Sequence, residues 1–170
     1  MTITPLFSAE QIRQAIHRTA DEILATLGTE EPVVVLCLLN GALWFAADLL
    51  RFLPVNFELQ TIRISSYTGA ESAGALTWHD TLPNCRGKRV LVLDDVLDTG
   101  LTMKTVCEAL RTNGAATVLS AVAVDKQGCR TVAFEVDFRA LVCENVFLVG
   151  YGLDFNGKYR NLPYIGHVTL

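Results

Sequence analysis

The chain has little charge and no long apolar run. Only 19% of its 170 residues are Asp, Glu, Lys or Arg, while 51% are hydrophobic, so a disordered protein is excluded because there is ample apolar surface to bury. The longest uninterrupted apolar run, Val33 to Leu39, has seven residues, far fewer than the roughly 18–20 that a membrane-spanning helix needs. A chain of this length is expected to form one domain whose core needs neither disulfide nor metal for folding.

An excess of basic side chains is also missing. Fourteen Lys and Arg stand against eighteen Asp and Glu, which gives a net charge of −4. Nucleic-acid binding usually requires a concentrated basic surface, so these counts argue against it, although they do not exclude a small anionic ligand. The first residues lack the basic segment and apolar run of a secretory signal, so a cytoplasmic protein is expected.

The five cysteines lack the spacing of a thiolate metal site or a disulfide framework. Their number is odd, and no two of them form a Cys-x-x-Cys pair. Cys37, Cys107 and Cys143 lie in apolar context and are expected to be small buried hydrophobic residues. The three histidines, at 17, 79 and 167, form no spaced cluster, so no histidine metal site is predicted.

Strands and helices are predicted in alternation. The expected order is a helix between Ser8 and Gly28, a strand at 33–39, a helix at 42–50, strands at 57–65 and 90–93, a helix from 103 to 114, and strands at 116–124 and 145–149. The alternating residues 132–138 predict a strand of a separate small sheet, and the small polar residues 66–74 predict a mobile loop. This order implies an α/β fold with a doubly wound, mostly parallel sheet, in which ligands bind at the carboxyl ends of the strands.

The segment that follows the strand at 90–93 carries the most chemistry. Asp94 and Asp95 come directly after four apolar residues, and Asp98 and Thr99 lead through a glycine into a helix. Capping of the helix by Asp98 or Thr99 does not explain two adjacent carboxylates, which repel each other. A helix N-terminus with hydroxyls suits a phosphate, and the acidic pair suits ribose hydroxyls or a magnesium ion. The segment therefore predicts a ligand with a phosphate, vicinal hydroxyls and a metal-bound leaving group.

This segment resembles the phosphoribosyl-pyrophosphate signature of the type I phosphoribosyltransferases, in which apolar residues precede an acidic pair and then Asp-Thr-Gly-x-Thr. The tail, at 149–155 and 159–166, is similar to the end of the hypoxanthine-guanine phosphoribosyltransferases, and the similarity extends from about Val33 to Gly166. The resemblance implies a Rossmann-like fold in a single domain over 1–170, with a small hood from the N-terminal segment and roughly 130–170. It also implies a purine salvage enzyme that transfers the 5-phosphoribosyl group from phosphoribosyl pyrophosphate to hypoxanthine and/or guanine, with Mg²⁺ as cofactor.

The resemblance implies a role for each residue at the purine. Asp98 would be the catalytic base at the purine ring, and Lys126 would donate a hydrogen bond to the 6-oxo group. An ammonium group there would favour an oxygen over an exocyclic amine. Phe147 would stack on the purine, Leu148 would offer backbone atoms to its edge, and Asp154 would complete the purine-binding set.

The implied binding site for phosphoribosyl pyrophosphate is larger. Its residues would be Asn40, Gly41, Ser66, Tyr67, Asp94, Asp95, Asp98, Thr99, Gly100, Leu101, Thr102 and Arg160. Mg²⁺ would be bound by Asp94, Asp95 and Asp154, directly or through water. The segment that begins at Ser66 and Tyr67 would close over the site and exclude water.

Each of these residues also has a plainer interpretation. Asp98 could cap the following helix, Lys126 could be a solvated loop lysine, and Phe147 could belong to the core. Asp154 and Arg160 could form an ordinary salt bridge with each other. A non-catalytic regulator of the same fold, which binds phosphoribosyl pyrophosphate without transferring it, is the alternative function.

The sequence departs from the family after its first buried strand. The family usually has Leu-Lys-Gly there, whereas this chain has Leu39-Asn40-Gly41. The resemblance implies that the backbone of Asn40 and Gly41 would still contact pyrophosphate, whereas the contribution of the lysine side chain is in question. A phosphoacceptor signalling domain would need acidic residues at this same place and is therefore disfavoured. The apolar excess favours a homodimer or homotetramer.

Overall fold

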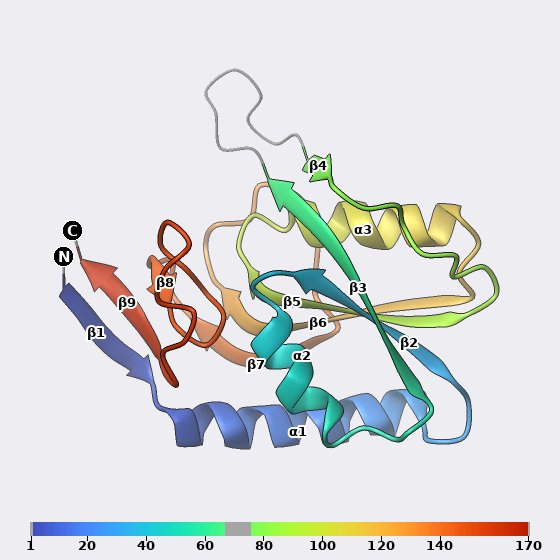
Figure 1. The fold of residues 1–170 in the computed structure, drawn as a ribbon, viewed down its shortest axis with the longest axis horizontal. Coiled ribbons are helices and arrows are strands. Elements are labelled where there is room, and N and C mark those ends of the chain that lie inside the picture. Colours follow the sequence, from blue (N-terminus) through green and yellow to red (C-terminus); the bar gives the residue numbers. More distant parts are fainter. Residues whose placement is uncertain (1, 67–75, 170) are drawn as a thin grey trace.

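The computed structural model describes residues 2–66 and 76–169, so Tyr67 and nearly all of the predicted 66–74 loop lie outside the described residues. Nine strands and three helices are described within these ranges (Figure 1). In chain order they are β1 (Thr2–Phe7), α1 (Ala9–Leu27), β2 (Val33–Leu39), α2 (Leu43–Leu50), β3 (Phe57–Ser66), β4 (Leu76–Trp78), β5 (Arg89–Leu97), α3 (Leu101–Thr112), β6 (Thr117–Lys126), β7 (Phe138–Cys143), β8 (Leu148–Val149) and β9 (Ile165–Thr169).

The larger sheet has the strand order β4-β3-β2-β5-β6-β7. Its neighbours from β3 to β7 are parallel, and only β4 runs antiparallel to its partner. The helices α1 and α2 cover one face, while α3 covers the other (Figure 1). The prediction of a doubly wound, mostly parallel sheet is therefore confirmed.

Strand β2 shows why the sheet is covered on both faces. Its residues alternate between two apolar clusters, so that Val35 packs into the cluster with α1 and α2, and Leu36 into the cluster with α3. Because both faces are buried, the strand has a continuous apolar sequence rather than an alternating one.

The predicted ends of α1 are confirmed. The Ser8 side chain accepts a hydrogen bond from the Gln11 amide, and the Gln11 side chain accepts one from the Ser8 amide, which completes a capping box. Gly28 ends the helix with φ +69°, a conformation that favours glycine. Among the described residues, no helix combines the length and apolar character needed to cross a membrane.

The positions of two expected strands, at 132–138 and 145–149, differ from those in the structure. Residues 132–137 are irregular, because Val136 and Phe134 pack against the α3 side of the sheet as single residues without pairing to a neighbour. The strand in this region is β7, which starts at Phe138 and joins the larger sheet beside β6. The strand expected at 145–149 is limited to β8.

A second sheet joins the two ends of the chain, in the order β1-β9-β8 (Figure 1). Neither β1 nor β9 was expected from the sequence, because β1 contains Pro5 and the two strands pair with each other across almost the whole length of the chain. The single domain over 1–170, with a hood that includes roughly 130–170, stays a prediction.

Strand β5 continues further than expected, and this extension positions the acidic residues. The sequence predicted an end at Leu93, whereas pairing with β6 runs on through Asp94↔Val122 and Val96↔Val124 to Leu97↔Asp125. Asp94 and Asp95 therefore belong to the strand, and the loop begins at Asp98.

Candidate active site

A cleft of about 740 Å³ lies at the carboxyl ends of β2, β3 and β5. The whole segment 94–103 lines it, together with Gly41, Asp154 and Arg160. A larger hollow of about 940 Å³ lies at the opposite end of the sheet, beside residues 27–34 and 87–89, away from every predicted site residue. The cleft is thus the place where the sequence expected a ligand.

The cleft brings together most of the predicted residues. Those that line it are Gly41, Asp94, Asp95, Asp98, Thr99, Gly100, Leu101, Thr102, Asp154 and Arg160. Lys126 reaches the cleft through Asp98, as described below. Asn40, Phe147 and Leu148 are not among the described residues that line it. Ser66 is the last residue of β3, where its neighbour Ser65 lines the cleft, and Tyr67 falls outside the described part of the chain.

Asp94 and Asp95 form a strained pair of carboxylates. Asp94 accepts a hydrogen bond from the Asp95 amide at 2.9 Å, and Asp95 accepts one from the Val96 amide at 2.8 Å. Burial, followed by the charge of Asp95, raises the pKa of Asp94 well above its ordinary value. Burial also raises the pKa of Asp95, against the opposing effects of its hydrogen bonds and of Arg160. The charge of Arg160 acts on Asp95 but does not outweigh the effect of burial, so the pKa values of both carboxyls stay raised.

Gly41 allows the Asp95 carboxylate to lie against the chain after β2. A Cβ atom at this position would be 1.7 Å from Asp95 Oδ2 and 2.4 Å from its Cγ, so any side chain would displace the carboxylate. On the other side of this segment, a Cβ at Gly152 would be 2.2 Å from the Gly41 carbonyl oxygen. The peptide bond between Leu39 and Asn40 is cis. The sequence predicted backbone contact here, and the structure explains the need for glycine.

The start of α3 faces the cleft. Gly100 precedes the helix with φ +84°, and Leu101, Thr102 and Met103 line the cleft from the first turn. The Thr99 hydroxyl accepts a hydrogen bond from the Leu101 amide at 3.3 Å. The positive end of the helix dipole and the amides of the first turn suit this place to an anion.

Asp98 does not cap α3, because its carboxylate forms an ion pair with Lys126 at 3.0 Å. Lys126 is the last residue of β6 and is buried, so the interpretation as a solvated loop lysine is wrong. Burial by itself would raise the pKa of Asp98, but its contacts with Cys129 and Lys126 and the charges of Lys126 and Arg130 outweigh that effect and lower the pKa. Asp98 is therefore ionised at neutral pH.

Asp154 and Arg160 form the salt bridge that the plainer interpretation expected, with Nη2 and Oδ1 at 2.7 Å. Both residues nevertheless line the cleft. Arg160 also donates to the Gly152 carbonyl at 2.5 Å, and Asp154 accepts from the Gly157 amide at 2.7 Å. The pair therefore places one cation and one anion, each held by its own backbone contact, at the edge of the cleft.

Phe147 is half exposed, so the interpretation as a core phenylalanine is wrong. Its ring makes an edge-to-face contact with Phe155, with the ring centroids 5.5 Å apart. Leu148 is buried in β8, opposite His167 of β9. The roles of Phe147 and Leu148 at a purine stay predictions.

The carboxylates of the cleft suit a cation that shares its ligands with a substrate. Within residues 2–66 and 76–169, no three His, Cys, Asp or Glu side chains are grouped closely enough to hold a metal ion by themselves. Mg²⁺ is usually held by one or two carboxylates, with substrate phosphates and water as the other ligands. The hard oxygen atoms of Asp94 and Asp95 and the raised pKa of both fit such a partial site.

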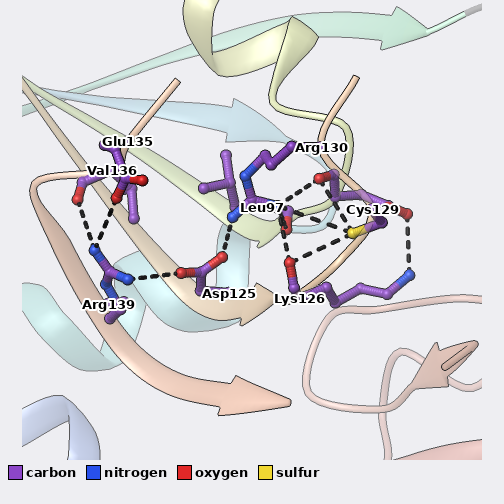
Figure 2. Close-up of polar contacts among 9 residues, drawn as sticks. Leu97, Asp125, Lys126, Cys129, Arg130, Glu135, Val136 and Arg139 are labelled. Atoms are coloured by element: carbon purple, nitrogen blue, oxygen red, sulfur yellow. Dashed lines mark hydrogen bonds and ion pairs between the residues drawn. The ribbon is translucent and has the colours of Figure 1, made fainter. Parts of the chain in front are cut away.

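The sequence interpretation missed the network beside Asp98. The buried Asp125 forms an ion pair with the partly buried Arg130, and Arg130 also contacts the backbone of Asp98 and Lys126 (Figure 2). Thr131, the next residue, lines the cleft. The signals were an acid at the end of a buried strand and an arginine four residues after the predicted purine-binding lysine.

Comparison with known proteins agrees with this geometry. Residues 4–156 match the phosphoribosyl transferase domain family. The chain is 37% identical over 163 residues to the hypoxanthine-guanine-xanthine phosphoribosyltransferase of Tritrichomonas foetus, an alignment that covers 95% of this chain and 88% of the relative. It is 38% identical over 162 residues to the hypoxanthine-guanine phosphoribosyltransferase of Aquifex aeolicus, with 94% and 91% covered. A crystal structure of a hypoxanthine-guanine phosphoribosyltransferase from Bacillus anthracis superposes with a TM-score of 0.91 at 30% identity, covering 99% of this chain and all of that one.

Replacing Gly41 with Ala should destabilise the protein by about 1–3 kcal/mol, because the new Cβ would overlap the Asp95 carboxylate. The same substitution in an Asp95→Ala background should cost much less, since the overlapping atoms are then absent. Urea denaturation of the four proteins in this cycle measures the difference. Equal costs of Gly41→Ala in both backgrounds would show that the carboxylate does not determine the glycine.

Replacing Asp94 with Asn should stabilise the ligand-free protein, because it removes one of two neighbouring charges and keeps an oxygen that can accept from the Asp95 amide. With its pKa raised on folding, Asp94 costs the wild-type protein stability as the pH rises from the ordinary Asp pKa of about 3.9 through the raised value. The gain should be smallest near pH 4 and reach about 1 kcal/mol, or about 2–4 °C in Tm, near pH 8.

Calorimetry without divalent cations or nucleotides measures this gain. Asp21→Asn is the matched control, because Asp21 is an exposed acid on α1 and does not line the cleft. A gain that is the same at both pH values, or a loss at pH 8, would contradict the electrostatic origin of the strain.

Proposed function

This chain belongs to the phosphoribosyl transferase family and, within it, to the hypoxanthine-guanine phosphoribosyltransferases, and from this premise we propose its reaction and its site. It transfers the 5-phosphoribosyl group from phosphoribosyl pyrophosphate to hypoxanthine and/or guanine and releases pyrophosphate. The observation that carries the proposal is the ion pair between Asp98, which lines the cleft, and Lys126; a carboxylate beside an ammonium suits a proton acceptor next to a hydrogen-bond donor for a purine.

Lys126 provides selectivity for the 6-oxo group of the purine. Its ammonium can only donate hydrogen bonds, so it pairs with a carbonyl oxygen and not with an exocyclic amine. The adjacent Asp98 accepts the proton of the purine ring nitrogen that attacks the ribose. When the purine oxygen takes up donors of Lys126, Asp98 keeps less of the positive charge that lowers its pKa, and this makes it a stronger base during the reaction.

The other half of the cleft binds the donor. The amides and hydroxyls of Thr99 to Thr102 at the start of α3 hold the 5-phosphate, and Asp94 and Asp95 accept from the ribose hydroxyls. Arg160 binds pyrophosphate. The transition state resembles an oxocarbenium ion, so the protein contributes mainly by positioning and by stabilising charge.

We propose Mg²⁺ as the cofactor, held by Asp94, Asp95 and Asp154 directly or through water. The support is the donor set, which consists of hard carboxylate oxygens, together with the raised pKa of Asp94 and Asp95, which the charge of Arg160 does not offset. When bound, Mg²⁺ neutralises the charge of the pyrophosphate leaving group. Arg160 provides the fixed positive charge on the same side, and Asp154 orients it through their salt bridge.

The enzyme is favoured over a regulator without activity. A protein that only binds phosphoribosyl pyrophosphate needs the phosphate-binding turn, the acidic pair and Asp98, whereas it has no use for Lys126 as a donor to a purine beside Asp98. Their contact depends on two strand ends held in register, since Leu97↔Asp125 is the last pair of β5 with β6.

The purified protein should form the nucleoside monophosphate from hypoxanthine, Mg²⁺ and phosphoribosyl pyrophosphate. Asp98→Asn should lower kcat by about 10²–10⁴-fold, because the amide cannot accept the purine proton, and should change donor affinity little. Ultraviolet absorbance measures turnover, and calorimetric titration measures donor affinity. The control is Asp21→Asn, which should have wild-type kinetics.

Hypoxanthine, guanine and xanthine should be tested in parallel, because their relative turnover decides the natural base. Donor binding without turnover of any of the three would favour the regulator. An equal loss of turnover and donor affinity in Asp98→Asn would contradict its role as a base.

We also propose a cytoplasmic homodimer or homotetramer. Large apolar side chains remain exposed near α2 and the start of β3, among them Phe52, Val55 and Leu59. Such side chains on neighbouring segments are typical of a surface that a second subunit covers. Light scattering should give two or four times the 18.6 kDa of one chain at micromolar concentration. The mass of a single chain under these conditions would contradict the proposal.

A further inference from the structure

Arg130 joins the ends of two neighbouring strands. Its Nη1 atom donates to three carbonyl oxygens, those of Leu97 at 2.9 Å, Asp98 at 2.5 Å and Lys126 at 2.9 Å (Figure 2). Leu97 is the last residue of β5, and Lys126 is the last residue of β6. One guanidinium group therefore bridges the two segments that carry the proposed catalytic base and the purine-binding lysine.

Beyond the last backbone pair of β5 and β6, hydrogen bonds from Arg130 connect the two chain segments. The last register pair of β5 with β6 is Leu97↔Asp125, one residue before Asp98 and Lys126. Beyond it, Arg130 and the Cys129 thiol hold the backbone, since the single thiol hydrogen lies between the carbonyls of Asp98 and Lys126, which are 3.3 Å and 3.4 Å from the sulfur. These hydrogen bonds replace the missing sheet ladder at the two residues whose side chains meet.

Asp125 fixes the direction of the Arg130 guanidinium. It is only 2% exposed, and its two carboxylate oxygens accept from two different arginines. Oδ1 pairs with Nη2 of Arg130, and Oδ2 accepts from Nη1 of Arg139 at 3.0 Å. Arg139 is itself held by the Val136 carbonyl at 3.4 Å and by Glu135 at 3.6 Å. Rotation of this buried carboxylate would break an ion pair on either side, so its orientation is fixed. Because it holds Nη2 of Arg130, it also fixes the plane of the guanidinium and directs Nη1 at the carbonyls.

The stem of Arg130 also contacts the phosphate-binding turn. A Cβ added at Gly100 would be 3.3 Å from Cδ of Arg130, so the aliphatic part of the side chain packs over that glycine. The following residue, Thr131, donates from its amide to the Thr99 carbonyl at 3.0 Å. The stem and the head of Arg130 thus have separable roles, because only the head reaches Asp125 and the three carbonyls.

We propose that Arg130, oriented by Asp125, is a positioning residue that sets the distance between Asp98 and Lys126 and so aligns the purine with the base that deprotonates it. This inference rests on the proposed transfer to a purine. It requires the planar guanidinium, which can bind a carboxylate with one nitrogen and carbonyls with the other, whereas an ammonium cannot span both.

The test compares Arg130→Met and Arg130→Lys with Arg89→Met. Both Arg130 variants keep the aliphatic stem over Gly100 and remove only the guanidinium. Arg89 is the matched control. Like Arg130 it is partly buried and donates to a backbone carbonyl and a carboxylate, those of Leu27 at 2.5 Å and Glu31 at 3.1 Å. It is the first residue of β5, however, and lies at the end of the sheet opposite the cleft.

Arg130→Met should lower kcat/KM for hypoxanthine by about 10-fold to 100-fold, because a misplacement of about 1 Å between reacting groups has effects of this size. The affinity for phosphoribosyl pyrophosphate should stay within about threefold, since the start of α3 and the acidic pair are unchanged. Arg130→Lys should recover only part of the loss. Arg89→Met should lower Tm without changing either kinetic constant.

Asp125→Asn tests the second step of the inference. It should reproduce part of the kinetic defect, and the double variant Asp125→Asn/Arg130→Met should be no worse than Arg130→Met, because the two residues act as a unit. Independent, multiplying losses in kcat/KM would overturn the role of Asp125 as the orienting partner.

The outcomes separate this inference from the proposed function. A wild-type protein that binds the donor but transfers nothing would refute the proposed function. A wild-type protein that transfers, with Arg130→Met indistinguishable from Arg89→Met in kcat/KM, would refute the positioning role. If Arg130→Met does not fold, the kinetics of Arg130→Lys decide, since wild-type values for that variant would also refute it.

Discussion

The parallel pairing of β5 with β6 is the interaction on which the whole site depends. It buries two continuous apolar strands and carries them in register as far as Leu97↔Asp125. Asp98 and Lys126 each follow that last pair by one residue. The register of the two strands therefore brings their side chains to 3.0 Å from each other, although the two residues are far apart in the sequence. Stability and site geometry thus have the same origin, because the apolar residues that hold the sheet together also bring the polar ones into reach.

The acidic residues of the cleft are in two contrasting electrostatic states. Asp98 and Asp154 each pair with a cation, Lys126 and Arg160 respectively. Asp94 and Asp95 face each other from adjacent positions, and burial raises the pKa of both. Under the proposed function, the energy that the acidic pair costs the ligand-free protein would be recovered when a cation and ribose hydroxyls bind, and it would then contribute to affinity. Strain of this kind is typical of functional sites, where local stability is exchanged for affinity.

Much of the fold and the acidic half of the site could be predicted from the sequence, because both depend on local patterns. The segment 90–102 by itself contains the apolar strand, the acidic residues and the glycine turn from which a ligand site is predicted. The alternation at 132–138 led to a wrong prediction of a strand. Phe134 and Val136 alternate because each packs into the apolar cluster on the α3 side of the sheet. The Asp137 side chain accepts a hydrogen bond from the Ser120 amide at 2.8 Å. Periodicity alone cannot distinguish a strand from an irregular segment with the same inward residues.

The network around Arg130 was beyond sequence reasoning for a different reason. Three of its partners are backbone carbonyls, which every residue type has, so the sequence does not indicate them. The fourth is Asp125, whose burial follows only from the extension of β6 to Lys126. The same extension explains why Lys126 is buried rather than solvated. Its ammonium lies 3.0 Å from the Asp98 carboxylate. Ion pairs thus fix the positions of Lys126 and Arg160 before any ligand binds. Under the proposed function, a substrate oxygen would replace a carboxylate oxygen as the acceptor, and that exchange costs less than ordering a free side chain.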